Sequence, residues 1–330
     1  MGMKKAALLS ILLVAVQLAV AVLAEAQQPA KIPRIGIVTA QPLSAISVRH
    51  EAFRQGLREL GYLEGKNILI EQRSAEGKFD RLPALMAEIV RLGADVIVSY
   101  GPTTTRVAKQ ATSTIPIVMA QDTDPVGNGF VVSLARPGGN ITGLSSLAAD
   151  LSGKRLELLR EIVPKLSRIA ILGSSANPGN TQSRNETESA AGALGLKVQY
   201  LDIVGSKDID AAFQSARESR VDAVFVIRGP VMNSQRKELV QLAAKYRLPA
   251  TYPTSEYAET GGLTSYDANS ADLARRAATY VDKILKGAKA SDLPVEQPTK
   301  FEFVINLRAA KQLGLDISQS VLYRADRVIK

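Results

Sequence analysis

Short apolar runs alternate with amphipathic stretches through most of this chain. Such an alternation is typical of strands and helices that follow one another in turn. Between residues 35 and 120 the expected strands span 35–39, 67–73, 95–100 and 116–120, and the expected helices span 48–60, 81–92 and 103–111. Alternation of this kind predicts parallel sheets built from strand–helix–strand units.

The same pattern then repeats in the second half. Arg34-Ile-Gly-Ile-Val opens the first half, and Arg168-Ile-Ala-Ile-Leu opens the second. The Gly101-Pro102 pair that ends one strand is answered by Gly229-Pro230 at the end of another. Coincidence is the alternative, because all such units share local signals, but agreement in order over several elements favours one fold used twice.

The C-terminal part predicts that the chain passes between two lobes more than once. A helix is expected over 271–286, an extended connector over 287–298, a strand over 300–305 and a helix over 307–313. The connector, Pro137–Asn140 and Gly261–Gly262 are the expected crossing points. Lobe I would then comprise 32–147 and 264–288, and lobe II 148–263 and 289–330. The predicted fold is α/β, with two doubly wound parallel-sheet lobes joined by a hinge of several strands.

The first 26 residues have the pattern of a secretory signal peptide. Lys4 and Lys5 precede a long apolar run, and Ala24-Glu25-Ala26 supplies a small-residue cleavage site. A transmembrane anchor is the alternative, but no basic stop-transfer cluster follows the run. We therefore expect a protein exported to the periplasm.

Cysteine is absent from the sequence. Disulfides are therefore excluded, and so is a lipid-accepting cysteine at the cleavage site. The exported chain is expected to be free in the periplasm and monomeric.

The charge is basic but dispersed. The formal net charge is +9, and removing Lys4, Lys5 and Glu25 with the signal segment leaves +9 − (+1) = +8. Because the basic residues form no runs interleaved with aromatics, a nucleic-acid partner is not expected.

Ligands of open parallel sheets bind beyond the carboxyl ends of the strands, so the loops after the strands hold the candidate residues. Thr39 and Gln41 follow the first strand, and Gly101, Thr103 and Thr104 follow the third. Hydroxyls and backbone N–H groups at a helix start could cradle a carboxylate. The alternative is that one threonine only caps the helix.

Three further loops complete the set. Gln121 and Asp122 follow the fourth strand, and a carboxylate there, at Asp122 or Asp124, could hold a ligand amine or merely begin a turn. In the second unit, Ser174, Asn177 and Arg228 occupy the matching positions. Arg228 could bind a carboxylate through its guanidinium or lie on the surface at a strand end.

Catalysis finds little support in the sequence. The one histidine, His50, has no metal-ligand or triad partner at a recognisable spacing, and we expect it to be solvated. Nucleophile-elbow, P-loop, dinucleotide and zinc-protease motifs are absent. Neither a cofactor nor a metal is expected, and an enzyme is the minority interpretation.

Several multi-residue motifs resemble the tryptophan/tyrosine-type substrate-binding proteins of ABC transporters. They are Gly56–Asn67, Asp124–Gly127, Ala135–Gly143, Lys154–Leu159, Gly261–Tyr266, Ile284–Gly287, Leu293–Lys300 and Ala325–Ile329. The resemblance implies a type I periplasmic-binding fold, a ligand carboxylate at Gly101–Thr104 and transient docking on an inner-membrane permease. The expected ligand is a small carboxylate-bearing solute, with aromatic amino acids among the candidates. A periplasmic receptor for a signalling protein is the alternative function.

Overall fold

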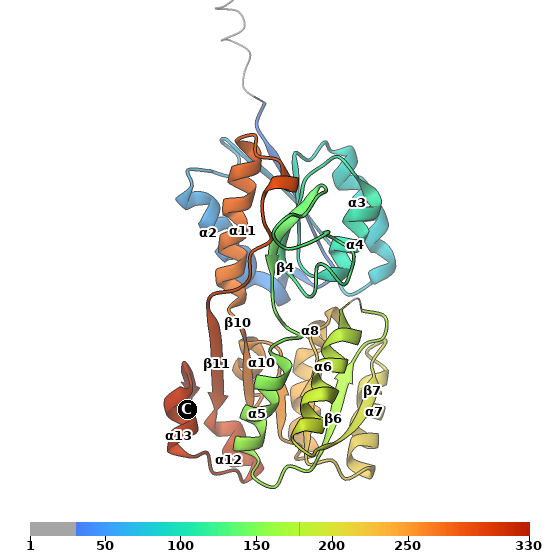
Figure 1. Cartoon of the computed structure of the whole chain (residues 1–330), viewed down its shortest axis with the longest axis vertical. Coiled ribbons are helices and arrows are strands. Elements are labelled where there is room, and N and C mark those ends of the chain that lie inside the picture. Colours follow the sequence, from blue (N-terminus) through green and yellow to red (C-terminus); the bar gives the residue numbers. More distant parts are fainter. Residues whose placement is uncertain (1–30, 178) are drawn as a thin grey trace, which may run out of the picture. The chain divides into compact units, whose positions relative to one another are not determined.

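The computed structural model describes residues 31–177 and 179–330. The expected signal peptide lies outside the described residues. Arg34–Lys330 form one compact unit, in which two sheets, each covered by helices, lie one above the other (Figure 1).

Lobe I contains a five-stranded sheet in which all neighbouring strands are parallel. Its order is β2-β1-β3-β4-β5, with β1 at Arg34–Thr39, β2 at Leu69–Ser74, β3 at Val96–Ser99, β4 at Ile117–Asp122 and β5 at Ile141–Ser145. Helices α2 (Ser47–Glu59) and α11 (Ser270–Leu285) cover one face, and α3 (Leu82–Arg91) and α4 (Pro102–Ala111) cover the other. Short 3-10 turns at Leu43–Ile46 and Phe79–Arg81 precede α2 and α3.

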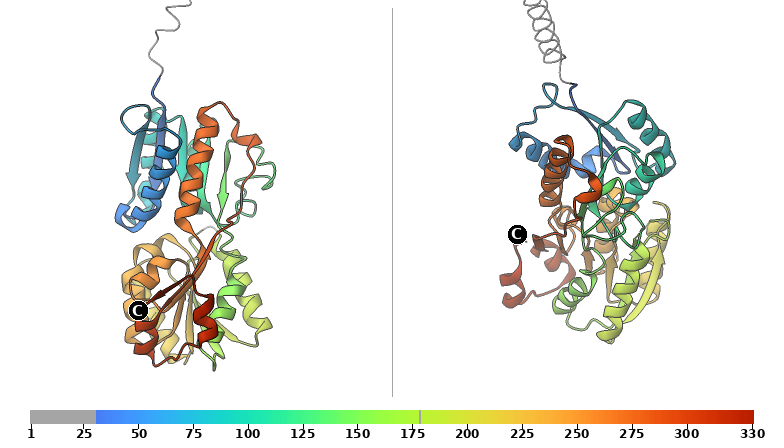
Figure 2. Two further views of the ribbon diagram at one scale, coloured as in Figure 1. Left: turned by 90° about the vertical axis from the view of Figure 1, so that its left-hand side faces the viewer. Right: turned by 45° about the horizontal axis from the view of Figure 1, so that its top comes forward.

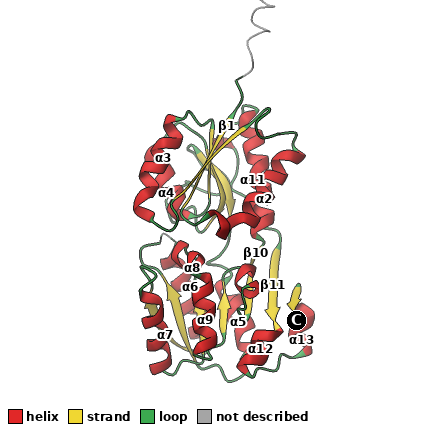
Figure 3. Ribbon diagram, turned by 180° about the vertical axis from the view of Figure 1, so that it is seen from behind, coloured by secondary structure: helices red, strands yellow, loops and turns green. Residues whose placement is uncertain are grey.

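Lobe II contains a seven-stranded sheet of order β12-β11-β10-β9-β8-β6-β7. The strands are β6 Arg168–Gly173, β7 Lys197–Asp202, β8 Ala223–Val226, β9 Ala250–Tyr252, β10 Thr264–Ala268, β11 Phe301–Asn306 and β12 Arg327–Ile329. One face packs on α5 (Ser152–Ile162), α6 (Asn180–Ala193), α12 (Leu307–Leu313) and α13 (Gln319–Arg324). The other packs on α7 (Asp208–Glu218), α8 (Pro230–Ser234), α9 (Arg236–Lys245) and α10 (Ser255–Glu259) (Figure 3).

The predicted strands and helices are present with boundaries shifted by one or two residues. One expectation about the sheets is wrong, because β11 runs antiparallel to β10. The chain leaves lobe II at the end of β10 and returns at the start of β11, so the two strands must run in opposite directions.

The chain crosses between the lobes three times, but two crossings differ from those expected. The three connections between the lobes can be followed in Figure 2. They lie at residues 146–151, at Asn269 and near Lys300, and the Asn269 amide donates to the Lys300 carbonyl at 2.9 Å. Pro137–Asn140 stays in lobe I, because the Asn140 carbonyl accepts from the start of β4. Gly261–Gly262 stays in lobe II, where the Gly262 amide closes α10.

The expected lobe boundaries change accordingly. Residues 264–268 are β10 and belong to the lobe II sheet. Part of the connector that follows α11 belongs to lobe I, because the Glu296 amide donates to the Gly143 carbonyl of β5 at 2.9 Å. Backbone pairing decides both assignments.

Helix α11 is bound to lobe I through close packing on α2. The contact needs a glycine at position 56, because a Cβ there would lie 2.6 Å from the Arg275 carbonyl oxygen and 2.9 Å from the Ala278 Cβ. Both approaches are shorter than van der Waals contact. Gly56 therefore fixes how closely the two helices approach.

We predict that Gly56→Val lowers the free energy of unfolding by about 1–3 kcal/mol, because the side chain would overpack the interface. Gly192→Ala is the control, since a Cβ at that helical position meets no atom within 4 Å. The control should leave stability unchanged or raise it by up to about 1 kcal/mol. Urea unfolding of both variants measures the difference, and equal stabilities would contradict the packing assignment.

Candidate functional site

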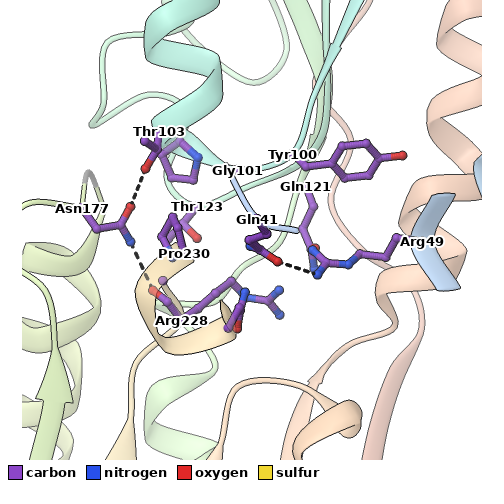
Figure 4. A pocket seen from close by; sticks show the side chains of 13 residues that line it. Gln41, Arg49, Tyr100, Gly101, Thr103, Gln121, Thr123, Asn177, Arg228 and Pro230 are labelled. Atoms are coloured by element: carbon purple, nitrogen blue, oxygen red, sulfur yellow. Dashed lines mark hydrogen bonds between the residues drawn. The ribbon is translucent and has the colours of Figure 1, made fainter. Parts of the chain in front are cut away.

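A pocket lies where the carboxyl ends of the two sheets face each other (Figure 4). Its lining comes from both lobes: Gln41, Arg49, Tyr100, Gly101, Pro102, Thr103, Gln121 and Thr123 from lobe I, and Asn177, Arg228, Gly229, Pro230 and Asn233 from lobe II. The cavity volume is about 30 Å³, enough for about two water molecules. An organic ligand therefore requires the lobes to move apart.

Strand alternation decides which side chains of lobe I reach the pocket. Gln121 and Thr123, at and just beyond the end of β4, line it, whereas Asp122 between them does not. Successive side chains of an extended segment point to opposite sides. Gly101 joins β3 to α4 with φ at +94°, a conformation that favours glycine.

Asn177 connects the two sides of the pocket. Its side-chain oxygen accepts a hydrogen bond from the Thr103 hydroxyl at 3.0 Å, and its amide nitrogen donates to the Arg228 carbonyl at 3.2 Å. The first bond joins lobe I to lobe II, and the second lies within lobe II. The structure therefore has the two lobes in contact across the cleft.

Arg228 already has an acidic partner. Its guanidinium forms an ion pair with Asp267, at the end of β10, and donates to the Pro253 carbonyl at 3.0 Å. Burial lowers the pKa of Arg228 to about 9. The predicted surface position is therefore excluded, and the positive charge of this residue is balanced inside lobe II.

Arg49 is the charged pocket residue that the sequence interpretation missed, and Asn233 of α8 was missed as well. Arg49 lies in the first turn of α2 and is 5% exposed, and it donates to the Gln41 side-chain oxygen at 3.3 Å. Its Nε has no hydrogen-bond partner, and among the described residues no carboxylate forms an ion pair with it. Burial lowers the pKa of Arg49, opposed mainly by Glu256.

The sequence contained a signal for Arg49. It falls on the buried stripe of α2, one helical turn before Phe53, which is followed a turn later by Leu57. A charged residue on the apolar face of an amphipathic helix needs a partner or a function.

Four other expected residues lie beneath the lining and do not reach it: Thr39, Thr104, Asp122 and Ser174. The Thr39 hydroxyl accepts from the Gln41 amide at 3.2 Å, and the Thr104 hydroxyl donates to the Gly101 carbonyl at 2.9 Å. The Ser174 amide donates to the Asn180 side chain at 2.8 Å. These residues shape the loops that hold the lining.

Asp122 is fully buried under the first turn of α4. Burial raises the pKa of its carboxyl to about 8. The hydrogen bonds from the Thr105 hydroxyl and the Thr123 backbone act in the opposite sense and favour the ionised form, but the effect of burial is larger.

The expectation that His50 is solvated is wrong. The residue is 6% exposed, its ring centroid lies 5.4 Å from that of Tyr100, and its Nδ1 is 2.7 Å from the Gln72 amide nitrogen. Burial and the charges of Arg54 and Arg49 lower the pKa of His50 to about 4. His50 is therefore a neutral side chain that supports the ring of Tyr100.

Over residues 31–177 and 179–330, no group of three or more His, Cys, Asp or Glu residues is arranged to hold a metal ion. No helix within those ranges has the length and apolar character to cross a membrane.

Comparison with known proteins decides the family. Residues 35–329 match the ABC transporter substrate binding protein family. The chain belongs to this family. As a substrate-binding protein of ABC transporters it has a type I periplasmic-binding fold, as the sequence resemblance predicted.

Several relatives support the assignment. A tyrosine-binding protein from Clostridioides difficile is 25% identical over 282 residues, covering 85% of this chain and 81% of that protein. A structure from Streptococcus pneumonia in complex with L-Trp is 27% identical, with a TM-score of 0.84 over 90% of this chain and 99% of that one. A conserved domain protein from Vibrio cholerae is 28% identical, with a TM-score of 0.86 over 90% of this chain and all of that one.

We predict that Asp122 makes stability depend on pH. Because its pKa is raised in the folded state, it binds a proton more tightly there than in the unfolded chain, so stability falls as the pH rises from about 4 to about 8. The contribution to the slope is at most about 1.4 kcal/mol per pH unit. Asp122→Asn should remove this contribution, measured as the unfolding free energy at pH 5 and pH 8.

Asp124→Asn is the matched control, because that carboxylate accepts from the Gly127 amide in a turn. It should keep the wild-type pH dependence. An unchanged slope in Asp122→Asn would show that this carboxyl is not protonated in the folded protein.

Proposed function

We propose that this substrate-binding protein captures a small carboxylate-bearing organic solute by closure of its two lobes, and delivers it to the permease of an ABC importer. We place it in the periplasm, where the expected signal peptide would export it as a free monomer. The solute is bound without chemical conversion. The observation that carries the proposal is a pocket lined by both lobes at the facing carboxyl ends of their sheets.

Contact between the lobes supports capture by closure. The direct bond between Thr103 and Asn177 exists only while the lobes are together. A ligand that adds contacts to both lobes would favour this closed state over an open one. The cavity of about 30 Å³ implies that the ligand enters when the lobes are apart and that the closed pocket then adapts to it.

Two features of lobe I support a carboxylate as the recognised group. The amide of Thr103 lies in the first turn of α4, where the helix offers it no acceptor. Arg49, with its buried guanidinium, lines the same pocket. An N-terminal helix turn and a guanidinium together are a suitable site for a carboxylate.

An aromatic ligand has less support in the structure than a carboxylate-bearing one. Relatives include a tyrosine-binding protein and a protein solved with L-Trp. Of the residues that the structure describes, Tyr100 is the one aromatic side chain that lines the pocket. The remaining apolar lining comes from proline and glycine, so an aromatic acid and a smaller aliphatic acid both fit the composition of the lining.

The test is a thermal-shift screen of the purified protein against amino acids, aromatic acids and other small carboxylates, followed by calorimetric titration of each compound that responds. A ligand should raise the melting temperature through mass action, by an amount that grows with its concentration. A well-folded protein that responds to no compound in such a screen would contradict the proposal.

We predict that Asn177→Ala lowers the affinity for the identified ligand about fivefold, because loss of the interlobe bond destabilises the closed state by about 1 kcal/mol. Ser175→Ala is the control from the same loop. Its hydroxyl binds Asp202 within lobe II at 2.6 Å and does not line the pocket. Equal affinities for the two variants would rule out a role of the Thr103–Asn177 contact in capture.

A further inference from the structure

The charges around the pocket do not balance. Three guanidinium groups lie at or just below it: those of Arg49 and Arg155, which are buried, and that of Arg228, whose side chain is 12% exposed. Arg228 senses the charges of both Arg49 and Arg155. Two carboxylates, from Glu256 and Asp267, accompany them. These three guanidinium groups and two carboxylates leave a surplus of one positive charge, to which Arg236 adds through its effect on Arg49.

The surplus is located at Arg49. Arg228 is paired with Asp267. Arg155 does not line the pocket: it stacks on the Phe225 ring at 4.1 Å and donates to the Val226 and Thr251 carbonyls. Arg49 is the guanidinium that both lines the pocket and lacks an ion-pair partner.

Glu256 only partly offsets Arg49. It acts on Arg49 through space without forming an ion pair, and Arg236 acts on Arg49 in the opposite sense. A buried charge without a close partner costs free energy, which a ligand of opposite charge recovers. An anion placed beside Arg49 would complete the cluster.

The pocket offers no comparable site for a ligand ammonium. Among the described residues that line it, none is Asp or Glu. Asp122, the sequence-based candidate for this role, lies beneath the lining under α4. Its carboxyl favours the neutral form, because burial raises its pKa to about 8. An ammonium in the pocket would meet two guanidinium groups and no exposed carboxylate.

We propose that the solute is a net anion, a carboxylic acid without an α-ammonium group, held through its carboxylate by Arg49. The inference rests on the proposed function and narrows it. The chain would then differ in ligand charge from relatives described as binding tyrosine or L-Trp. A zwitterion needs an anionic group for its ammonium as well as a cation for its carboxylate, and this pocket supplies the cation.

The experiment uses matched pairs of acids that differ only in the α-amino group. The pairs are L-tyrosine with 3-(4-hydroxyphenyl)propanoate, L-leucine with 4-methylpentanoate, and L-aspartate with succinate, each titrated calorimetrically into the full-length purified protein. We expect at least one amino-free acid to bind at least tenfold more tightly than its amino-acid partner.

Variants then test Arg49 itself. Arg49→Met should lower the affinity for that acid at least tenfold. Arg49→Lys, which keeps the charge, should lower the affinity less. Arg58→Met is the control, because it makes the same change on the same helix at an exposed ion pair with Glu51. The control should bind like the wild type. Thermal melting without ligand shows whether each variant is folded, and Arg49→Lys remains the test if Arg49→Met does not fold.

Three results would overturn the inference. Tighter binding of the amino acid in every pair that responds would refute the anionic ligand while leaving solute capture intact. Equal binding of the acid by Arg49→Met and Arg58→Met would remove Arg49 from the site. Binding of no compound from either half of the panel, or from the broader screen, would count against the proposed function as well.

Discussion

The carboxyl ends of the parallel strands in both sheets face one cleft, and the site depends on this constraint. Strand direction places the loops after β1, β3 and β4 opposite the loops after β6 and β8. No single lobe could surround a ligand with these residues. The reversal of direction at β11 preserves the arrangement, because it lets α11 cover lobe I while the flanking strands stay in lobe II.

The charged side chains determine the chemistry of the cleft. Arg228 and Asp267 satisfy each other within lobe II, and Asp122, whose pKa burial raises to about 8, lies under α4 and outside the lining. Arg49 on lobe I is left with Gln41 as its hydrogen-bond partner. The lobe that presents the free guanidinium therefore also presents the first turn of α4, and the other lobe closes over them.

Much of the fold could be predicted from the sequence, because apolar periodicity and strand-ending Gly-Pro pairs are local signals. Crossing points could not be read in this way, since a turn such as Pro137–Asn140 has the same composition whether it joins lobes or strands. Six of the ten expected site residues line the pocket, among them Gln41 and Asn177. Neighbouring candidates such as Asp122 do not reach the lining, because alternation along an extended segment depends on a register that tertiary pairing sets. Arg49 was missed because the candidates came from the loops that follow the strands, whereas Arg49 lies on helix α2.

The central claim is that a ligand draws the two lobes together, and the distance between them tests it most directly. The chain has no cysteine, so a single cysteine introduced on each lobe can carry a spin label. Val132→Cys and Val204→Cys are suitable, because the two valines are 79% and 55% exposed. Pulsed electron resonance should show a distance distribution that shifts and narrows when a ligand found in the screen is added to saturation. An identical distribution with and without that ligand would contradict capture by closure.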